Sequence, residues 1–238
     1  MGENRTSYIP VKNRMGTAIV DEHDSFVQHM IFAAGRPDAA VLEIGAAFGD
    51  VSRSLAARGA VCTVNDLDAR NLAGVHDGLD EATRARLRVQ IGRFPDELTL
   101  ADSSFDAILV ARVLHFLGGE EIELAARTLF RWLRPGGFVV ATAETPFRGN
   151  LREFAPLYEA RLARQDPWPG IIEDTDVYFT SAANLPRRMN LLDRETIARP
   201  FRQCGFEIER CEFFERGGLP PAIKLDGREG VGVIARRR

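Results

Sequence analysis

The chain has 238 residues, of which 45% are hydrophobic and 27% are charged, a composition that is ordinary for a folded globular protein. A single domain of this length can bury a sizeable core. The formal net charge is −3. Because proteins that bind the phosphates of nucleic acids usually carry a basic face, we expect no nucleic-acid partner.

The N-terminal residues 1–12 are polar and lack the apolar centre of a signal peptide. No apolar run approaches the length that spans a bilayer. These features predict a cytoplasmic protein with no membrane partner. The three cysteines, Cys62, Cys204 and Cys211, form no Cys-x-x-Cys pair, so neither a disulfide framework nor a metal site is expected.

Short apolar runs alternate with amphipathic stretches along most of the chain, which is typical of a parallel sheet covered by helices on both faces. In chain order, the pattern predicts helices at Asp21–Ala34, Phe48–Arg58, Glu120–Arg134, Leu151–Arg164 and Asp193–Cys204, and Asp21 is the expected N-cap of the first. Between and after them it predicts strands at Ala40–Ile44, Val61–Asn65, Leu87–Gly92, Phe105–Ala111, Phe138–Glu144, Phe206–Phe214 and Val231–Arg236.

The segment from Pro146 to Leu192 interrupts this alternation, because it is rich in proline and aromatic residues and shows no clear strand. We interpret residues 146–192 as a lid inserted into a single domain that spans residues 1–238, with residues 1–36 forming an N-terminal arm and helix. Tyr158 either lines a substrate pocket or belongs to the buried stripe of a lid helix, and Trp168, in a rigid proline-rich turn, is a candidate for closing the pocket.

The residues Val41–Gly49 combine an apolar strand, an acid and a glycine turn that leads into a helix. Such a turn lets the backbone approach a ligand closely, and the N-terminus of the helix presents free N–H groups. The acid is Glu43, the glycines are Gly45 and Gly49, and Ala47 stands where a third glycine is common. This pattern alone fits several nucleotide-containing cofactors, NAD among them.

Asp66 ends the next strand, about 20 residues beyond the turn, where a carboxylate can accept hydrogen bonds from the ribose hydroxyls of an adenosine. Asp68 is expected to cap the helix that follows.

Five features, taken together and in this order, resemble the class I S-adenosylmethionine-dependent methyltransferases. They are the turn Val41–Gly49, the acid Asp66, the strand Ser104–Val110, the turn Trp132–Phe138 and the sequence Cys204-Gly205-Phe206 ahead of the last two strands. The resemblance implies an α/β, Rossmann-like fold: a seven-stranded, mostly parallel sheet with helices on both faces and an antiparallel C-terminal hairpin.

The resemblance also implies S-adenosylmethionine as the cofactor and S-adenosylhomocysteine as its product. Glu43 should lie near the methionine ammonium, Gly45 and Gly49 at the adenosyl backbone, and Asp66 at the ribose, while Ala111 should offer its carbonyl near the methionine end. The full set of residues expected at the cofactor is Glu43, Gly45, Ala47, Gly49, Asp66, Leu67, Phe94 and Ala111.

The sequence after the third strand departs from the family pattern. Many members have Gly-Asp there, whose acid meets the adenine amino group, but this chain has Gly92-Arg93-Phe94. Arg93 cannot accept a hydrogen bond, so backbone atoms would have to do so. Phe94 either stacks on the adenine or belongs to the core.

The sulfonium methyl group is already electrophilic, so transfer depends mainly on holding the acceptor in line, and a base is optional. His115 is a candidate general base, or else packs among its apolar neighbours. Glu144, at a strand end, is a candidate for orienting a cationic or hydroxylated substrate, or else caps the next segment. His23, Tyr8 and Arg14 are candidates for covering the cofactor.

We expect a small-molecule acceptor, with its acceptor atom (O, N, S or C) undetermined, and a monomer or homodimer. Two alternatives stay open. An NAD(P)-dependent reductase would use the same turn and ribose acid, but it leaves the C-terminal hairpin unexplained. A non-catalytic S-adenosylmethionine-binding module would account for the lack of an unambiguous base.

Overall fold

The structure is a computed structural model, and it describes residues 7–13, 15–20, 23–179 and 185–238. Its elements, in chain order, are β1 (Ser7–Pro10), β2 (Thr17–Val20), α1 (Ser25–Ala34), β3 (Ala40–Ile44), α2 (Asp50–Ala57), β4 (Val61–Asp66), α3 (Glu81–Ala85), β5 (Leu87–Ile91), β6 (Phe105–Ala111), η1 (Leu114–Phe116), α4 (Gly119–Trp132), β7 (Leu133–Glu144), η2 (Gly149–Leu151), α5 (Ala155–Ala163), β8 (Ile171–Ile172), η3 (Thr175–Val177), β9 (Met189–Asn190), α6 (Arg194–Gln203), β10 (Phe206–Phe214) and β11 (Gly230–Arg237).

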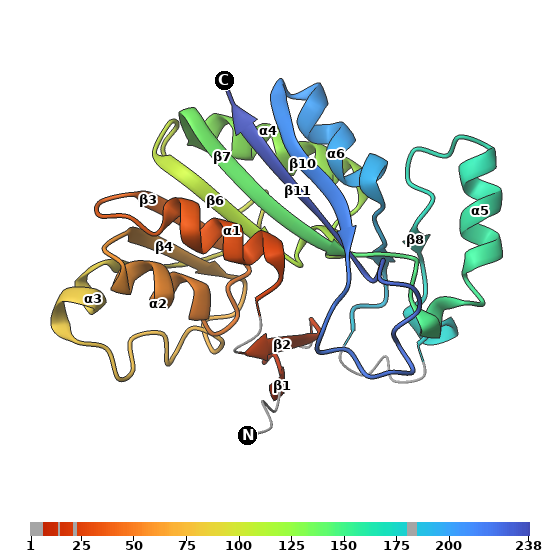
Figure 1. The fold of residues 1–238 in the computed structure, drawn as a ribbon, viewed down its shortest axis with the longest axis horizontal. Helices are drawn as coiled ribbons and strands as arrows, with labels where there is room; N and C mark the ends of the chain where they lie inside the picture. Colours follow the sequence, from red (N-terminus) through yellow and green to blue (C-terminus); the bar gives the residue numbers. More distant parts are fainter. Residues whose placement is uncertain (1–6, 14, 21–22, 180–184) are drawn as a thin grey trace.

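A seven-stranded sheet in the order β10-β11-β7-β6-β3-β4-β5 forms the centre of the molecule (Figure 1). Strands β3 to β7 pair in parallel, whereas β11 runs antiparallel to both of its neighbours, β7 and β10. This arrangement confirms the predicted fold class. It also turns the carboxyl ends of the parallel strands toward one edge of the sheet, where ligands of such folds bind.

Helices cover both faces of the sheet, with α1 and α2 on one face and α4 and α6 on the other (Figure 1). Each face has its own apolar core. Phe26 and Met30 of α1 are fully buried on the first face, and Trp132 of α4 and Phe201 of α6 are buried on the second. The strands between them are apolar on both sides because both sides are covered.

The five predicted helices are present, but their boundaries differ from the expectation by up to four residues. Helix α1 begins at Ser25 because the side chain of Asp24 accepts the N–H groups of Phe26 and Val27, at 2.9 and 3.0 Å. The expected cap, Asp21, lies outside the described residues. Helix α4 ends at Trp132 instead of Arg134, and the chain passes directly into β7.

The N-terminal arm contains a hairpin that the apolar pattern did not predict. Strands β1 and β2 pair antiparallel and lie at the edge of the sheet where the parallel strands end (Figure 1). The arm is tied to the loop after β4, because the Lys12 N–H donates to Asn71 Oδ1 at 2.8 Å and Arg70 Nη2 donates to the Lys12 carbonyl at 3.2 Å.

The segment 146–192 folds around a small apolar cluster of its own, which includes Leu151, Phe154 and Tyr158. The short pair β8–β9 within it was not predicted. Tyr158 is a core residue whose hydroxyl donates to Asp193 at 2.5 Å. Trp168 packs into the main core under Arg199, whose guanidinium lies 4.7 Å from the ring centroid, so it does not close a pocket.

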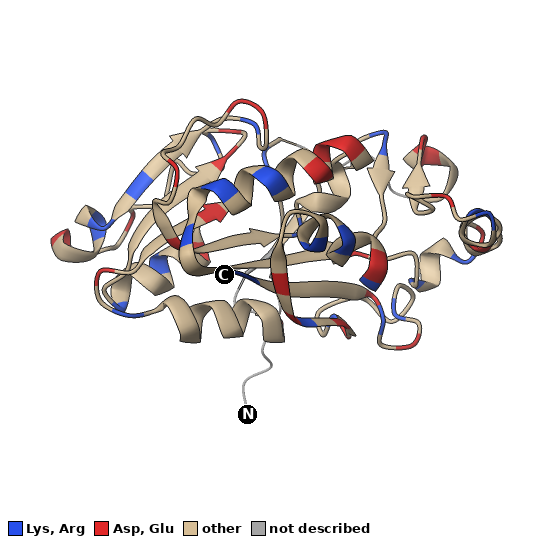
Figure 2. Ribbon diagram, turned by 90° about the horizontal axis from the view of Figure 1, so that it is seen from above, with Lys and Arg blue, Asp and Glu red and all other residues tan. Residues whose placement is uncertain are grey.

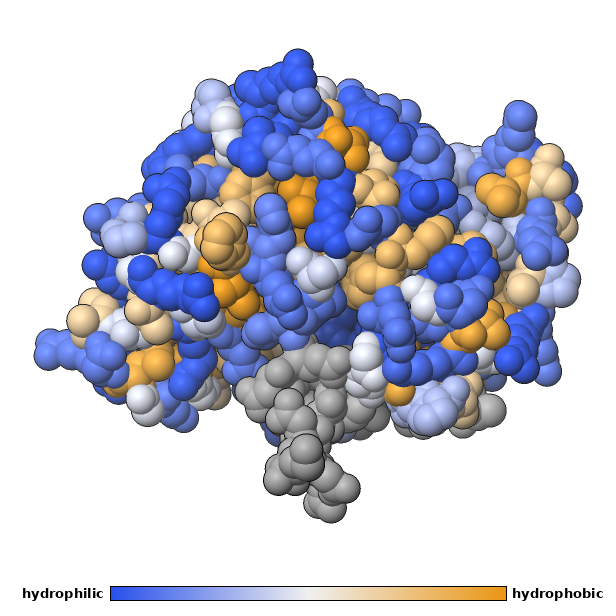
Figure 3. Space-filling model, viewed as in Figure 1, coloured by the Kyte–Doolittle hydropathy of each residue, from blue (hydrophilic) through white to orange (hydrophobic). Residues whose placement is uncertain are grey.

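Acidic and basic residues are interspersed on the face shown in Figure 2, and apolar groups on the face shown in Figure 3 are separated by hydrophilic ones. Within the described residues, no helix is both long and apolar enough to cross a membrane.

Candidate active site

A cavity of about 680 Å³ opens at the carboxyl ends of β3, β4, β6 and β7. This volume lies in the range of small-molecule and cofactor sites. A second cavity of about 300 Å³ adjoins it, and Gly45, Ala47, Ala111 and Arg112 line both. The expected cofactor turn therefore lies where the two hollows meet.

The turn after β3 owes its shape to backbone conformations that glycine adopts readily. Gly45 has a φ of +67°, and a Cβ added there would lie 2.3 Å from the Val113 side chain. Gly49, with a φ of +75°, precedes α2. Ala47, in the place of a third glycine, also has a positive φ of 50°. An L-residue with a side chain adopts this conformation only at a cost of about 1 kcal/mol or more.

Asp66 is buried at the end of β4 and is held by three protein donors. Its Oδ2 accepts the Ala47 N–H at 2.9 Å, and its Oδ1 accepts the Asp68 N–H at 2.9 Å and Asn71 Nδ2 at 3.0 Å. A carboxylate has roughly four acceptor positions. The protein thus orients Asp66 and leaves capacity for one further donor from the cavity.

Asp68 caps a turn and not a helix. Its Oδ1 accepts the Arg70 N–H at 3.0 Å, and its carboxylate pairs with the Arg70 guanidinium. The residues that follow form turns up to α3.

Glu43 lines the smaller cavity and is 5% exposed. Its Oε2 accepts both the N–H and the hydroxyl of Ser52, at 2.9 and 2.5 Å. Burial raises the pKa of the Glu43 carboxyl to about 7, although the Ser52 hydrogen bonds act in the opposite direction. A cation brought to this carboxylate would favour its charged form.

Leu67, Arg93 and Phe94, the residues that the sequence places near the adenine, line the large cavity. Leu67 is 47% exposed, whereas Phe94 is buried, with its ring 6.1 Å from that of Trp132. Phe94 is therefore part of the core, and only part of it borders the cavity. Arg93 is held by ion pairs with Asp96 and Glu121.

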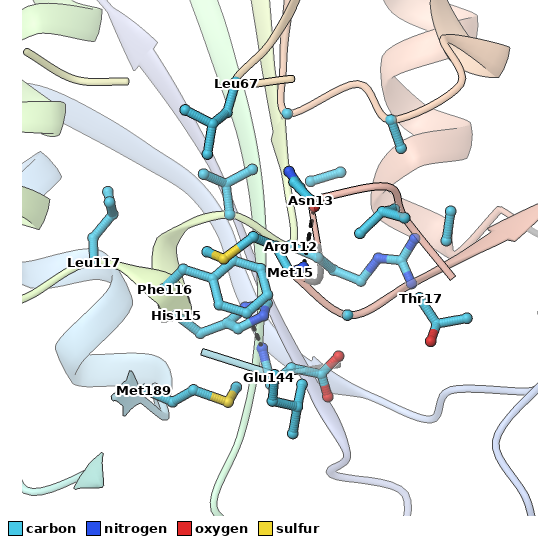
Figure 4. A pocket seen from close by; sticks show the side chains of 18 of the residues that line it. Asn13, Met15, Thr17, Leu67, Arg112, His115, Phe116, Leu117, Glu144 and Met189 are labelled. Atoms are coloured by element: carbon cyan, nitrogen blue, oxygen red, sulfur yellow. Dashed lines mark hydrogen bonds between the residues drawn. The ribbon is translucent and has the colours of Figure 1, made fainter. Parts of the chain in front are cut away.

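His115 is 3% exposed and lies beside Glu144 at the other end of the cavity (Figure 4). Its Nδ1 is 3.3 Å from the Glu144 backbone nitrogen. Since that N–H can only donate, Nδ1 accepts and the neutral ring carries its proton on Nε2. Burial lowers the pKa of His115 to about 3, so the ring is neutral at physiological pH. The neutral ring is the form that a general base requires, but a pKa of about 3 makes His115 a weak base, and its Nδ1 already accepts the Glu144 N–H.

Glu144 is the centre of a buried ion cluster. Its Oε2 accepts from Arg148 Nη1 at 2.7 Å, and its Oε1 accepts from Arg216 Nη1. Burial acts to raise the pKa of Glu144, but the charges of Arg216 and Arg148 outweigh it and hold the pKa at about 2. Because two arginines already neutralise this carboxylate, it does not offer a free charge to a cationic substrate.

Sequence reasoning named the N-terminal arm and residues 146–192 as covers, but it missed the loop 215–229 and most of the individual residues around His115 and Glu144. The walls at this end come from the N-terminal arm, from residues 146–192 and from the loop 215–229; the lining residues from these segments include Asn13, Met15, Thr17, Asn150, Phe179, Met189, Arg216, Leu219 and Ile223. Figure 4 shows Asn13, Met15 and Thr17 of the arm on the same side of the cavity as Arg112. For residues 215–229, the glycine and proline content indicated a loop, and the sequence did not indicate that this loop lines the cavity.

The remaining N-terminal candidates have different outcomes. His23 precedes α1 instead of lying on it, and it lines the smaller cavity. Arg14 and the side chain of Tyr8 lie outside the described part of the chain.

Comparison with known proteins agrees with this geometry. Residues 42–141 match the sequence model of a family described as a methyltransferase domain. Comparison with curated protein sequences finds no significant match.

Three solved structures are similar. A methyltransferase from Methanosarcina mazei aligns with a TM-score of 0.65 and 19% identity over 87% of this chain and 96% of that one. One from Mesorhizobium loti has a TM-score of 0.62 and 22% identity, over 89% and 95%. Both are described as S-adenosylmethionine-dependent. A glycopeptide N-methyltransferase in complex with sinefungin has a TM-score of 0.59 and 15% identity, over 90% and 88%.

Residues 42–141, which carry the glycine turn, thus match a methyltransferase domain, and the chain has the fold of the similar S-adenosylmethionine-dependent methyltransferases.

Proposed function

We propose that the protein transfers the methyl group of S-adenosylmethionine to a small molecule held at the His115–Glu144 end of the large cavity. This proposal rests on one observation: a single continuous cavity is lined by Asp66, at the expected ribose position, and by His115 and Glu144. Covering segments from three parts of the chain surround the acceptor end, which suits a small molecule better than a polymer.

The carboxylates that line the two adjoining cavities fit the hydrogen-bond donors of this cofactor. Asp66 has acceptor capacity for a ribose hydroxyl, and Glu43 has a buried carboxylate for the methionine ammonium. Leu67 and Phe94 would border the adenine, and the Ala111 carbonyl would face the methionine end. The turn residues Gly45, Ala47 and Gly49 would bring the backbone close to the adenosyl group. When bound, the cofactor supplies an electrophilic methyl group on a sulfonium.

The chain's own contribution is then to bind, orient and exclude water. His115, neutral and protonated on Nε2, would donate a hydrogen bond to the acceptor and hold it in line. Glu144 acts indirectly, since it fixes Arg148 and Arg216. The domain organisation proposed is a single domain, with residues 1–36 and the inserted segment 146–192 as covers. A cytoplasmic monomer or homodimer is part of the same proposal.

Two measurements test the function. Thermal shift should show stabilisation by S-adenosylhomocysteine and none by NADH. Transfer of a labelled methyl group from S-adenosylmethionine to a metabolite panel should yield a methylated product, and His115→Ala should lower the turnover number with little change in cofactor affinity. Stabilisation by NADH alone would indicate a reductase, and tight cofactor binding without any product would indicate a binding module.

A further inference from the structure

The ion cluster at the acceptor end has more positive charge than negative. The side chains of Arg148, Glu144 and Arg216 are only 11%, 9% and 10% exposed, and all three residues line the large cavity. Arg148 and Arg216 share the Glu144 carboxylate, and the charges of the buried Glu229 and of Arg112 act on the same groups. Three arginines and two carboxylates give this cluster a net charge of about +1. Buried charges are costly unless they are paired and hydrogen-bonded.

Much of the hydrogen-bonding capacity of Arg148 and Arg216 is unused. A guanidinium has five N–H donors in a planar fork. Within the described residues, each of the two arginines donates to Glu144 through Nη1 alone, and Arg148 Nε is buried without a hydrogen-bond partner.

The wall around the cluster is largely apolar. It includes Phe116, Phe179, Met189, Leu219 and Ile223. A molecule that fits this end would place an anionic group against the arginines and an apolar body against these side chains.

We propose that Arg148 and Arg216, with Glu144 between them, bind a carboxylate group of the methyl acceptor, and that the acceptor is a carboxylic acid with an apolar body. This inference rests on the proposed methyl transfer and names the substrate class of that same site. A monoanion brings the cluster to neutrality, and a carboxylate matches the flat fork of a guanidinium in a bidentate pair. An ammonium-bearing acceptor would add a positive charge to a site that already has an excess of it.

The test uses the full-length protein saturated with S-adenosylhomocysteine and four probes that share one alkyl chain. They are octanoate, octanamide, octylammonium and octyl phosphate, with binding measured by calorimetry. Octanoate should bind about tenfold or more tightly than octanamide, with octylammonium the weakest. Arg148→Gln and Arg216→Gln should each remove most of this preference.

Each Gln variant leaves a neutral Glu–Arg pair, so the fold should survive. If a Gln variant does not fold, Arg148→Lys or Arg216→Lys replaces it. Lysine keeps the positive charge but loses the planar guanidinium, so these variants should also lower the preference for octanoate over octanamide. Arg152→Gln is the matched control, because Arg152 is exposed on the same segment and does not line the cavity.

Several outcomes would overturn the carboxylate site: no octanoate binding at millimolar concentration, equal binding of the probes, tighter binding of octylammonium or octyl phosphate, or an unchanged preference in the arginine variants. Failure of S-adenosylhomocysteine itself to bind would instead contradict the proposed function, so the two results are distinguishable.

Discussion

The cofactor end and the acceptor end of the large cavity are built in different ways. At the cofactor end, Asp66 and, in the adjoining smaller cavity, Glu43 stand on neighbouring strands and are held by nearby donors, such as the Ala47 N–H and Ser52. At the acceptor end, the walls come from the N-terminal arm, residues 146–192 and the loop 215–229, which only the folded sheet brings together.

The electrostatics of the two ends differ as well. The carboxylates of Glu43 and Asp66 are each satisfied by neutral hydrogen-bond donors. Glu144 is satisfied by the charges of Arg148 and Arg216. A change at the cofactor end should therefore act mainly on cofactor affinity, whereas a change in the ion cluster should also act on folding. The predictions below test this distinction, from the largest expected effect to the smallest.

Glu144→Gln should lower the free energy of unfolding by about 3–5 kcal/mol, because it leaves two buried guanidinium groups without a counter-charge. Urea unfolding at pH 7 measures this loss. Glu153→Gln is the control: Glu153 is exposed within residues 146–192, so this change should have little effect on the free energy of unfolding. Equal unfolding free energies for the Glu144 variant and the wild type would contradict the role of the cluster.

The same cluster predicts a pH dependence. The pKa of Glu144 in the folded protein is about 2, below its ordinary value of 4.5, so the stability that it contributes is present above pH 4.5 and is lost as the pH falls toward 2. The wild type should lose more stability over this range than Glu144→Gln does.

Asp66→Asn should weaken S-adenosylhomocysteine binding by about 1–3 kcal/mol, because a charged acceptor for the ribose is lost and the Ala47 N–H loses its carboxylate partner. Calorimetry measures the change. Asp77→Asn, an exposed acid beyond the site, is the control. An unchanged dissociation constant for Asp66→Asn would remove Asp66 from the cofactor site.

The affinity for S-adenosylhomocysteine should rise by about tenfold between pH 6 and pH 8, since the ligand ammonium needs a charged Glu43 and the pKa of this carboxyl is about 7. Binding should therefore release a proton within this range. Glu43→Gln should bind more weakly at pH 8 and show a flat pH profile. A wild-type profile that is equally flat would place the ammonium elsewhere.

Ala47→Gly should have the smallest effect, a gain of at most about 1 kcal/mol in unfolding free energy. Glycine relieves the positive φ of 50°, but it also makes the unfolded chain more flexible. Thermal unfolding measures the change, and S-adenosylhomocysteine affinity should be retained. A loss of several kcal/mol would show that the Ala47 methyl group makes a packing contact that the turn requires.

The sheet could be predicted from the sequence because most of its strands contain a short apolar run, and the glycine turn and Asp66 could be predicted because they lie at strand ends. The N-terminal hairpin could not, because β1 and β2 are four residues each and have no apolar alternation that distinguishes them from loop. The sequence did not distinguish the cap Asp24 from the expected Asp21, because three acids, Asp21, Glu22 and Asp24, stand at the same helix start.

The acceptor end was harder to predict for a physical reason. Arg216 lies 72 residues from Glu144, so no local pattern connects them. The state of His115 depends on a hydrogen bond from the Glu144 backbone and on burial, which sequence does not reveal. The role of Asp66 could be predicted from its position at the end of a strand. The protonation states of His115 and Glu144, in contrast, depend on contacts with residues from other parts of the fold.

A crystal structure with S-adenosylhomocysteine bound tests the central claim most directly. The account predicts a ribose hydroxyl within hydrogen-bond distance of Asp66, the methionine ammonium beside Glu43, and the sulfur directed toward the space bounded by His115 and Arg148. A ribose bound away from Asp66, or a sulfur turned away from His115, would contradict it.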